Sequence, residues 1–147
     1  MKKKYRLFLV LPITLLSISA INCSSNSANN SARVSFFPVQ MAEHAKGPYP
    51  SALATGILVL DGGRLRLEYQ GTGYSNLLIW PYGYSQYIEG EEIRIVNIEG
   101  KTVARVGDII KVGGGEVPIV IVEKYIGKTL PEKCPGPYWL VSKVVID

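Results

Sequence analysis

Residues 91–117 read EEIRIVNIEGKTVARVGDIIKVGGGEV, and this stretch decides the fold class. It contains three short runs rich in β-branched residues, each followed by a turn, at residues 99–101, 107–108 and 113–115. In the first run Ile93 and Ile95 alternate with Arg94, which is the period-two pattern of a half-buried strand. Runs this short and turns this frequent leave no room for a helix. The stretch predicts a strongly bent antiparallel sheet that closes into a small barrel.

The same pattern continues on both sides. Residues 52–60 are apolar on both faces, which indicates a central strand, and residues 64–69 alternate cleanly after the turn at residues 61–63. Further strands are expected at residues 74–80, 117–124 and 140–146, with an edge strand at 34–39 and a helical turn within 40–46. We therefore expect an all-β domain over residues 34–147, a small antiparallel β-barrel of OB-like size with about five to seven strands.

The chain begins with the features of an export signal over residues 1–22. A cluster of lysines and one arginine precedes an apolar run that is shorter than a membrane-spanning helix and contains Pro12. Cys23 follows, and residues 19–23 resemble the lipobox of bacterial lipoproteins, with Asn22 where that motif prefers a small residue. The alternative is ordinary cleavage, for instance after Ala20, which would release a soluble secreted or periplasmic protein.

Residues 23–33 are read as the lipid-bearing Cys23 followed by a tether rich in serine and asparagine. This segment contains too little apolar surface to fold by itself. Two acyl chains on Cys23 would anchor the protein stably to a membrane, whereas one chain would not. The sequence thus predicts an exported domain held at the cell membrane or envelope by its N-terminal lipid.

The charge balance argues against a nucleic-acid partner. The chain has 16 basic and 12 acidic residues, but Lys2, Lys3, Lys4 and Arg6 lie in the predicted signal peptide. Its removal leaves 12 basic and 12 acidic residues, so the mature protein is neutral. Affinity for a phosphate backbone comes mainly from clustered cationic charge, and this domain lacks such an excess.

The sequence shows no catalytic constellation, metal-ligand cluster or cofactor motif. His44, the only histidine, lies in a proline-flanked segment and reads as solvated. Once Cys23 is lipidated, Cys134 has no disulfide partner, and a reactive thiol there would require a nearby base or cation. The glycine triplet at residues 113–115 reads as a turn, because no Lys-Ser/Thr pair or helix follows it.

Paired carboxylates are the remaining route to catalysis. Glu91 and Glu92 are adjacent and point to opposite faces of a strand, so they cannot share a site. Asp108 with Glu116 is the other pair considered. We expect no enzymatic activity from this composition.

An aromatic segment is the best candidate for a binding surface. Residues 80–87 contain four aromatic side chains beside proline and glycine: Trp80, Tyr82, Tyr84 and Tyr87. Exposed rings on a loop would stack on sugars, such as a cell-wall glycan or peptidoglycan, or grip an envelope protein. The alternative interpretation is structural, in which the rings cover one open end of the barrel.

Five motifs together resemble a family of small, uncharacterised bacterial β-rich proteins. They are the segments at residues 58–63, 79–83, 103–108, 113–117 and 134–141. The resemblance covers most of the mature domain and implies a shared fold, and it implies no activity. Family members often carry cysteine at the position of Arg64, which implies a disulfide to the later cysteine. This chain departs from that pattern, so the resemblance implies no such bond to Cys134 here.

Overall fold

The computed structural model describes residues 33–146. The predicted signal peptide, Cys23 and residues 24–32 of the tether lie outside the described residues. Nine elements of regular structure and one 3₁₀ turn follow in chain order: η1 Ala42–His44, β1 Ala52–Asp61, β2 Arg64–Glu68, β3 Ser75–Ile79, β4 Ser85–Glu89, β5 Glu92–Val96, β6 Thr102–Arg105, β7 Ile109–Val117, α1 Ile119–Ile126 and β8 Tyr138–Val145. The predicted β-rich class is confirmed over this part of the chain.

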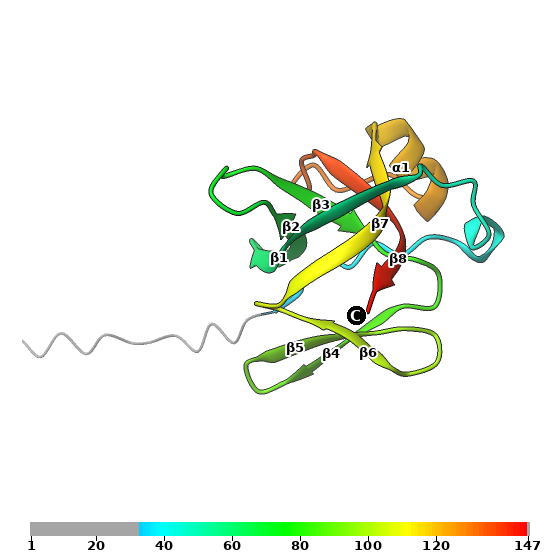
Figure 1. Ribbon diagram of the computed structural model, residues 1–147. Coiled ribbons are helices and arrows are strands. Elements are labelled where there is room, and N and C mark those ends of the chain that lie inside the picture. The colour runs from blue at the N-terminus through cyan, green and yellow to red at the C-terminus, as the bar shows by residue number, and fades with distance from the viewer. Residues whose placement is uncertain (1–32, 147) are drawn as a thin grey trace, which may run out of the picture.

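Five strands form a closed barrel in the order β1-β2-β3-β8-β7 (Figure 1). The β1–β2 hairpin turns at the predicted glycines, so that Asp61 lies opposite Arg64. The closing seam between β7 and β1 runs from the pair Ala52↔Gly114 to the pair Ile57↔Ile109. Strands β3 and β8 are parallel, which corrects the expectation of a purely antiparallel barrel. A closed ring with an odd number of strands cannot alternate in direction at every neighbour, so one pair in this five-stranded ring must be parallel.

A second sheet, β4-β5-β6, lies across the lower end of the barrel (Figure 1). It accounts for a strand total of eight, against the five to seven expected. One continuous apolar cluster joins Leu58 and Trp80 of the barrel region to Ile95 and Ala104 of this sheet. Because the two sheets share this core, the second sheet is packed on the barrel and closes that end of it.

Helix α1 covers the outer wall of the barrel at β3 and β8. Its Val122, Tyr125 and Ile126 are buried at helical spacing, in a cluster with Leu77 and Leu140. We expected a strand at residues 117–124, and this prediction is wrong. Pro118 precedes the first turn and Gly127 ends the helix in a left-handed conformation, so both ends have helix boundary residues.

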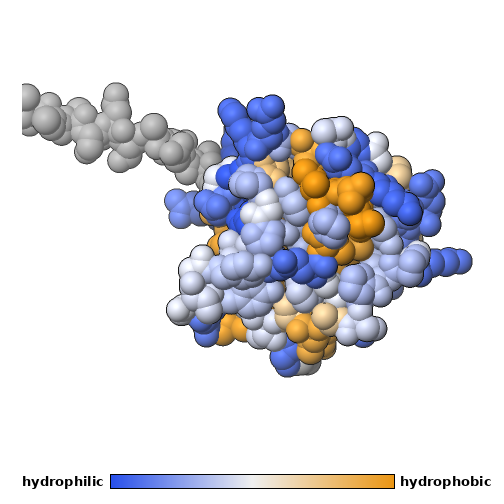
Figure 2. All heavy atoms as spheres, turned by 90° about the horizontal axis from the view of Figure 1, so that it is seen from above, coloured by the Kyte–Doolittle hydropathy of each residue, from blue (hydrophilic) through white to orange (hydrophobic). Residues whose placement is uncertain are grey.

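Two exposed apolar residues of α1 lie on its outer side, Ile119 and Val120. Figure 2 looks down on the end of the molecule that carries α1, and it shows an apolar patch within a largely polar surface.

Within residues 33–146 no helix has both the length and the apolar character needed to cross a bilayer.

The glycine triplet is part of strand β7 and does not form the turn that we expected. A Cβ on Gly114 would lie 1.9 Å from the carbonyl oxygen of Leu140, and one on Gly115 would lie 2.4 Å from Cβ of Pro50. The glycines therefore allow β8 and the N-terminal segment to approach β7 closely.

Residues 33–50 cross the outside of the barrel and form no continuous strand. The expected edge strand at residues 34–39 is reduced to two isolated bridges, Phe36↔Arg64 and Val39↔Trp80. Gln40 secures this segment, because its buried side-chain amide donates to the carbonyl oxygens of Ile79 at 3.1 Å and Val141 at 2.7 Å. The helical turn expected within residues 40–46 is confirmed by η1.

Candidate functional site

The four rings of the predicted aromatic surface separate into two groups. Trp80 is fully buried and stacks between Phe37 at 5.6 Å and Tyr84 at 6.2 Å, measured between ring centroids. Tyr82 and Tyr87 are 45% and 56% exposed. Trp80 is therefore removed from the candidate surface, because a side chain inside the shared core cannot contact a ligand. The position of Trp80 and Tyr84 agrees with the structural interpretation, in which these rings close one end of the barrel.

Tyr87 lies on the outer face of the second sheet. It is opposite Arg94 of β5, which in turn is opposite Arg105 of β6. Two glutamates neutralise this row: Arg94 contacts Glu89 at 3.0 Å, and Arg105 contacts Glu92 at 3.1 Å. The ion pairs fix the arginine side chains beside the tyrosine ring.

A shallow pocket of about 200 Å³ lies beside Tyr87 and Arg94 and is completed by Val96, Gly100 and Thr102. The Nε atom of Arg94 is buried, makes no hydrogen bond to the described residues and lies 3.7 Å from a carboxylate oxygen of Glu92. An exposed aromatic ring beside a shallow pocket is a surface on which the flat face of a sugar can stack.

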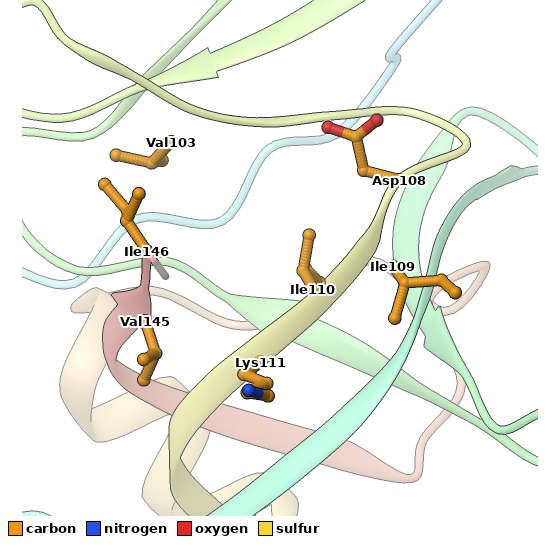
Figure 3. Close-up of a pocket in the computed structure, with 7 residues that line it drawn as sticks. All are labelled: Val103, Asp108, Ile109, Ile110, Lys111, Val145 and Ile146. Atoms are coloured by element: carbon orange, nitrogen blue, oxygen red, sulfur yellow. The ribbon is translucent and has the colours of Figure 1, made fainter.

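A larger groove of about 360 Å³ runs between the barrel and the second sheet (Figure 3). Val103 and Ile146 lie at one end of it and Asp108 at the other. The carboxylate of Asp108 accepts a hydrogen bond from the backbone N–H of Arg105 at 2.9 Å, so it stabilises the turn before β7. Five of its seven lining residues are aliphatic, and Asp108 and Lys111 are its charged members.

Asp108 and Glu116 do not form a carboxylate pair. Asp108 precedes β7 and Glu116 lies close to its far end, so the eight intervening steps place them roughly 26 Å apart. Glu116 instead accepts hydrogen bonds from the Tyr74 hydroxyl at 2.7 Å and the Asn76 amide at 3.1 Å. Both hydrogen bonds hold the pKa of Glu116 below its usual range, and the bond from Tyr74 has the larger effect.

Sequence reasoning did not find this Glu116 network. Asn76 is fully buried in β3, and its Oδ1 atom has no partner among the described residues. The sequence offered one signal for this network, because Asn76 is a polar residue that directly precedes the apolar part of β3. The network links β7 to the β2–β3 hairpin and holds an ionised carboxylate at the barrel end opposite the second sheet.

The surroundings of His44 differ from the expected ones, and Cys134 lies near groups that the sequence could not place. The ring of His44 stacks on Tyr125 with 4.4 Å between centroids, so His44 is packed and not simply solvated. Cys134 is a free and buried thiol. It lines a pocket of about 210 Å³ together with Arg64 and Lys133, so cations that the sequence could not place do lie near it.

No family model, curated protein or solved structure matches this chain. The resemblance stated from the five motifs therefore stays a prediction.

Proposed function

We propose that this protein is a non-enzymatic bacterial envelope lipoprotein that carries a small binding domain at the membrane surface. The lipid would be attached to Cys23, and the tether at residues 23–33 would let the domain reach its partner. The observation that carries the binding role is the outward-facing Tyr87, which is 56% exposed and lines a shallow pocket together with Arg94.

The architecture we propose for this domain is an OB-like barrel. Its support is the order β1-β2-β3-β8-β7, a ring of five strands in which only the β3–β8 pair is parallel. In this proposal the second sheet is an insertion between β3 and β7. Barrels of this type bind oligosaccharides and oligonucleotides at their faces and loops. Because the predicted mature chain has no net charge, we favour an uncharged oligosaccharide over an oligonucleotide as the ligand.

The lipid anchor is tested by metabolic labelling. We expect a palmitate analogue to label the full-length protein in cells, and the label to be lost in Cys23→Ala, because acylation requires that sulfur. The protein should move from the membrane fraction to the soluble fraction in the same variant. Cys134→Ala is the matched control and should keep both label and location. Unchanged labelling of Cys23→Ala would refute the anchor, and ordinary cleavage near Ala20 would then replace it.

A second candidate function is binding to a cell-wall glycan, favoured by the pocket beside Tyr87 and Arg94. A stacked aromatic ring typically contributes about 0.5–1.5 kcal/mol to such an interaction, so Tyr87→Ala should weaken retention on purified cell walls by roughly two- to tenfold.

The control for this test is Ile88→Ala. Ile88 is the next residue on β4, is 46% exposed and points away from the Tyr87 face. Retention that is equal for wild type and Tyr87→Ala would exclude this face as the glycan site. An envelope protein captured through Tyr87, with no glycan retention, would support the first proposal alone.

A further inference from the structure

The pocket that Cys134 lines lies where the β1–β2 turn meets the segment before β8. It has a volume of about 210 Å³ and is lined by Ser35, Phe36, Gly62, Arg64, Pro131, Lys133 and Cys134. Two of these seven residues are cations and none is acidic. The isolated bridge Phe36↔Arg64 holds one wall in place, and the N–H of Ser35 donates to the Gly63 carbonyl at 2.8 Å.

A third cation lies at the edge of this pocket. The Nζ atom of Lys128 is 5.7 Å from the centroid of the Phe36 ring, which is a cation–π contact. Phe36 itself lines the pocket. Three segments therefore place a positively charged side chain at or beside the pocket: the start of β2 with Arg64, the turn after α1 with Lys128, and the loop before β8 with Lys133.

The arginine behind the pocket adds to this charge. Arg66 is only 6% exposed, and its guanidinium donates to neutral oxygens of Ser75, Pro135 and Gly136. None of the described carboxylates forms an ion pair with it. Burial lowers the pKa of Arg66, and the nearby Arg64 lowers it further, while Asp61 has the opposite effect. Asp61 does not line the pocket, and neither does Glu132, which lies in the chain between Pro131 and Lys133.

The donors in the pocket suit a compact oxyanion. The Nε–H of Arg64 donates to the Asp61 carbonyl at 3.2 Å, and no described residue accepts from its two terminal nitrogens. A guanidinium with both terminal nitrogens available binds phosphate oxygens in a forked geometry, while a lysine adds a point charge. The volume corresponds to about seven water molecules, which is enough for one phosphate group.

We propose that this pocket binds a phosphate group, with Arg64 and Lys133 as its principal ligands. This site is separate from the Tyr87 face and does not depend on the function proposed for that face. Its chemistry is the same for free phosphate and for a phosphate ester in a lipid headgroup or an envelope polymer. The competing structural interpretation is that Arg64 and Lys133 are ordinary solvated surface cations.

The test is a titration of the mature chain, with Cys23→Ser so that no lipid is attached, at constant ionic strength. Inorganic phosphate and glycerol phosphate are the two probes, and backbone amide signals are followed by NMR. We expect saturable shifts at Gly62 and Cys134, which line the pocket. Saturation by both probes would point to an ester as the natural ligand, whereas saturation by inorganic phosphate alone would point to the free ion.

Arg64→Gln and Lys133→Gln should each weaken phosphate binding by at least fivefold. The melting temperature of Lys133→Gln should not change, because Lys133 is exposed, and that of Arg64→Gln should change little, because the half-buried Arg64 side chain makes a single hydrogen bond, to the Asp61 carbonyl. Lys124→Gln is the matched control, since it removes an exposed lysine of α1 that does not line the pocket. Linear shifts without saturation at Gly62 and Cys134, or equal weakening by Lys124→Gln, would overturn the proposal. Either result would show only general attraction between phosphate and a basic surface.

Discussion

Replacement of Trp80 by alanine is expected to lower the free energy of unfolding by about 3–5 kcal/mol, which is the usual cost of truncating a large buried aromatic residue. Trp80 is fully buried and belongs to the cluster that joins the barrel to the second sheet. Its removal would leave a cavity between Phe37 and Tyr84, the two rings that stack on it. Urea unfolding measures the loss, as a lower midpoint with an unchanged slope.

Tyr87→Ala is the control for this prediction. The Tyr87 side chain is more than half exposed, so its removal should change the free energy of unfolding by no more than about 0.5 kcal/mol. The pair of variants separates packing from recognition within one aromatic segment. If Trp80→Ala kept its stability and lost cell-wall binding, Trp80 would have to be accessible, and the burial described for it would be incorrect.

The outcome for this segment shows what the sequence can and cannot decide. Composition marks residues 80–87 as rich in aromatic side chains, but it does not state which rings face the core. Strand alternation contains part of the answer, because Trp80 follows Leu78 by two residues and so shares its buried face. Tyr82 and Tyr87 lie beyond that strand, where the path of the chain cannot be derived from local patterns.

Helix α1 was missed because local preference and tertiary packing disagree. The run from Ile119 to Val122 consists of β-branched residues, whose intrinsic preference is for a strand. The helix forms because Val122, Tyr125 and Ile126 share one face that the outer wall of β3 and β8 can bury. Pro118 and Gly127 were the local signals for its two ends.

The phosphate pocket depends on long-range placement. Arg64 and Lys133 are far apart in the sequence, and each reads as an ordinary surface cation. They meet because residues 33–39 pass beside the β1–β2 turn and the loop after α1 returns to the same region. The β-hairpins, by contrast, were predictable, because alternation and turn residues act over a few positions.

Gly114→Ala is the second substitution for which we expect a large loss, at least about 3 kcal/mol of unfolding free energy. Two costs add at this position. The backbone φ angle is +135°, a conformation that residues with a Cβ atom rarely adopt. In addition, the new Cβ would lie 1.9 Å from the carbonyl oxygen of Leu140 and 3.1 Å from the indole nitrogen of Trp139, so β8 would have to move away from β7.

Gly71→Ala separates these two costs. Gly71 also has a positive φ, +73°, but nothing lies within 4 Å of the position that its Cβ would take. We therefore expect only the conformational cost there, about 1–2 kcal/mol. Urea unfolding of both variants gives the difference, which measures how tightly β8 is held against β7. Equal losses would mean that β8 shifts without cost, and the close approach of the strands could then no longer explain why the chain places three consecutive glycines within β7.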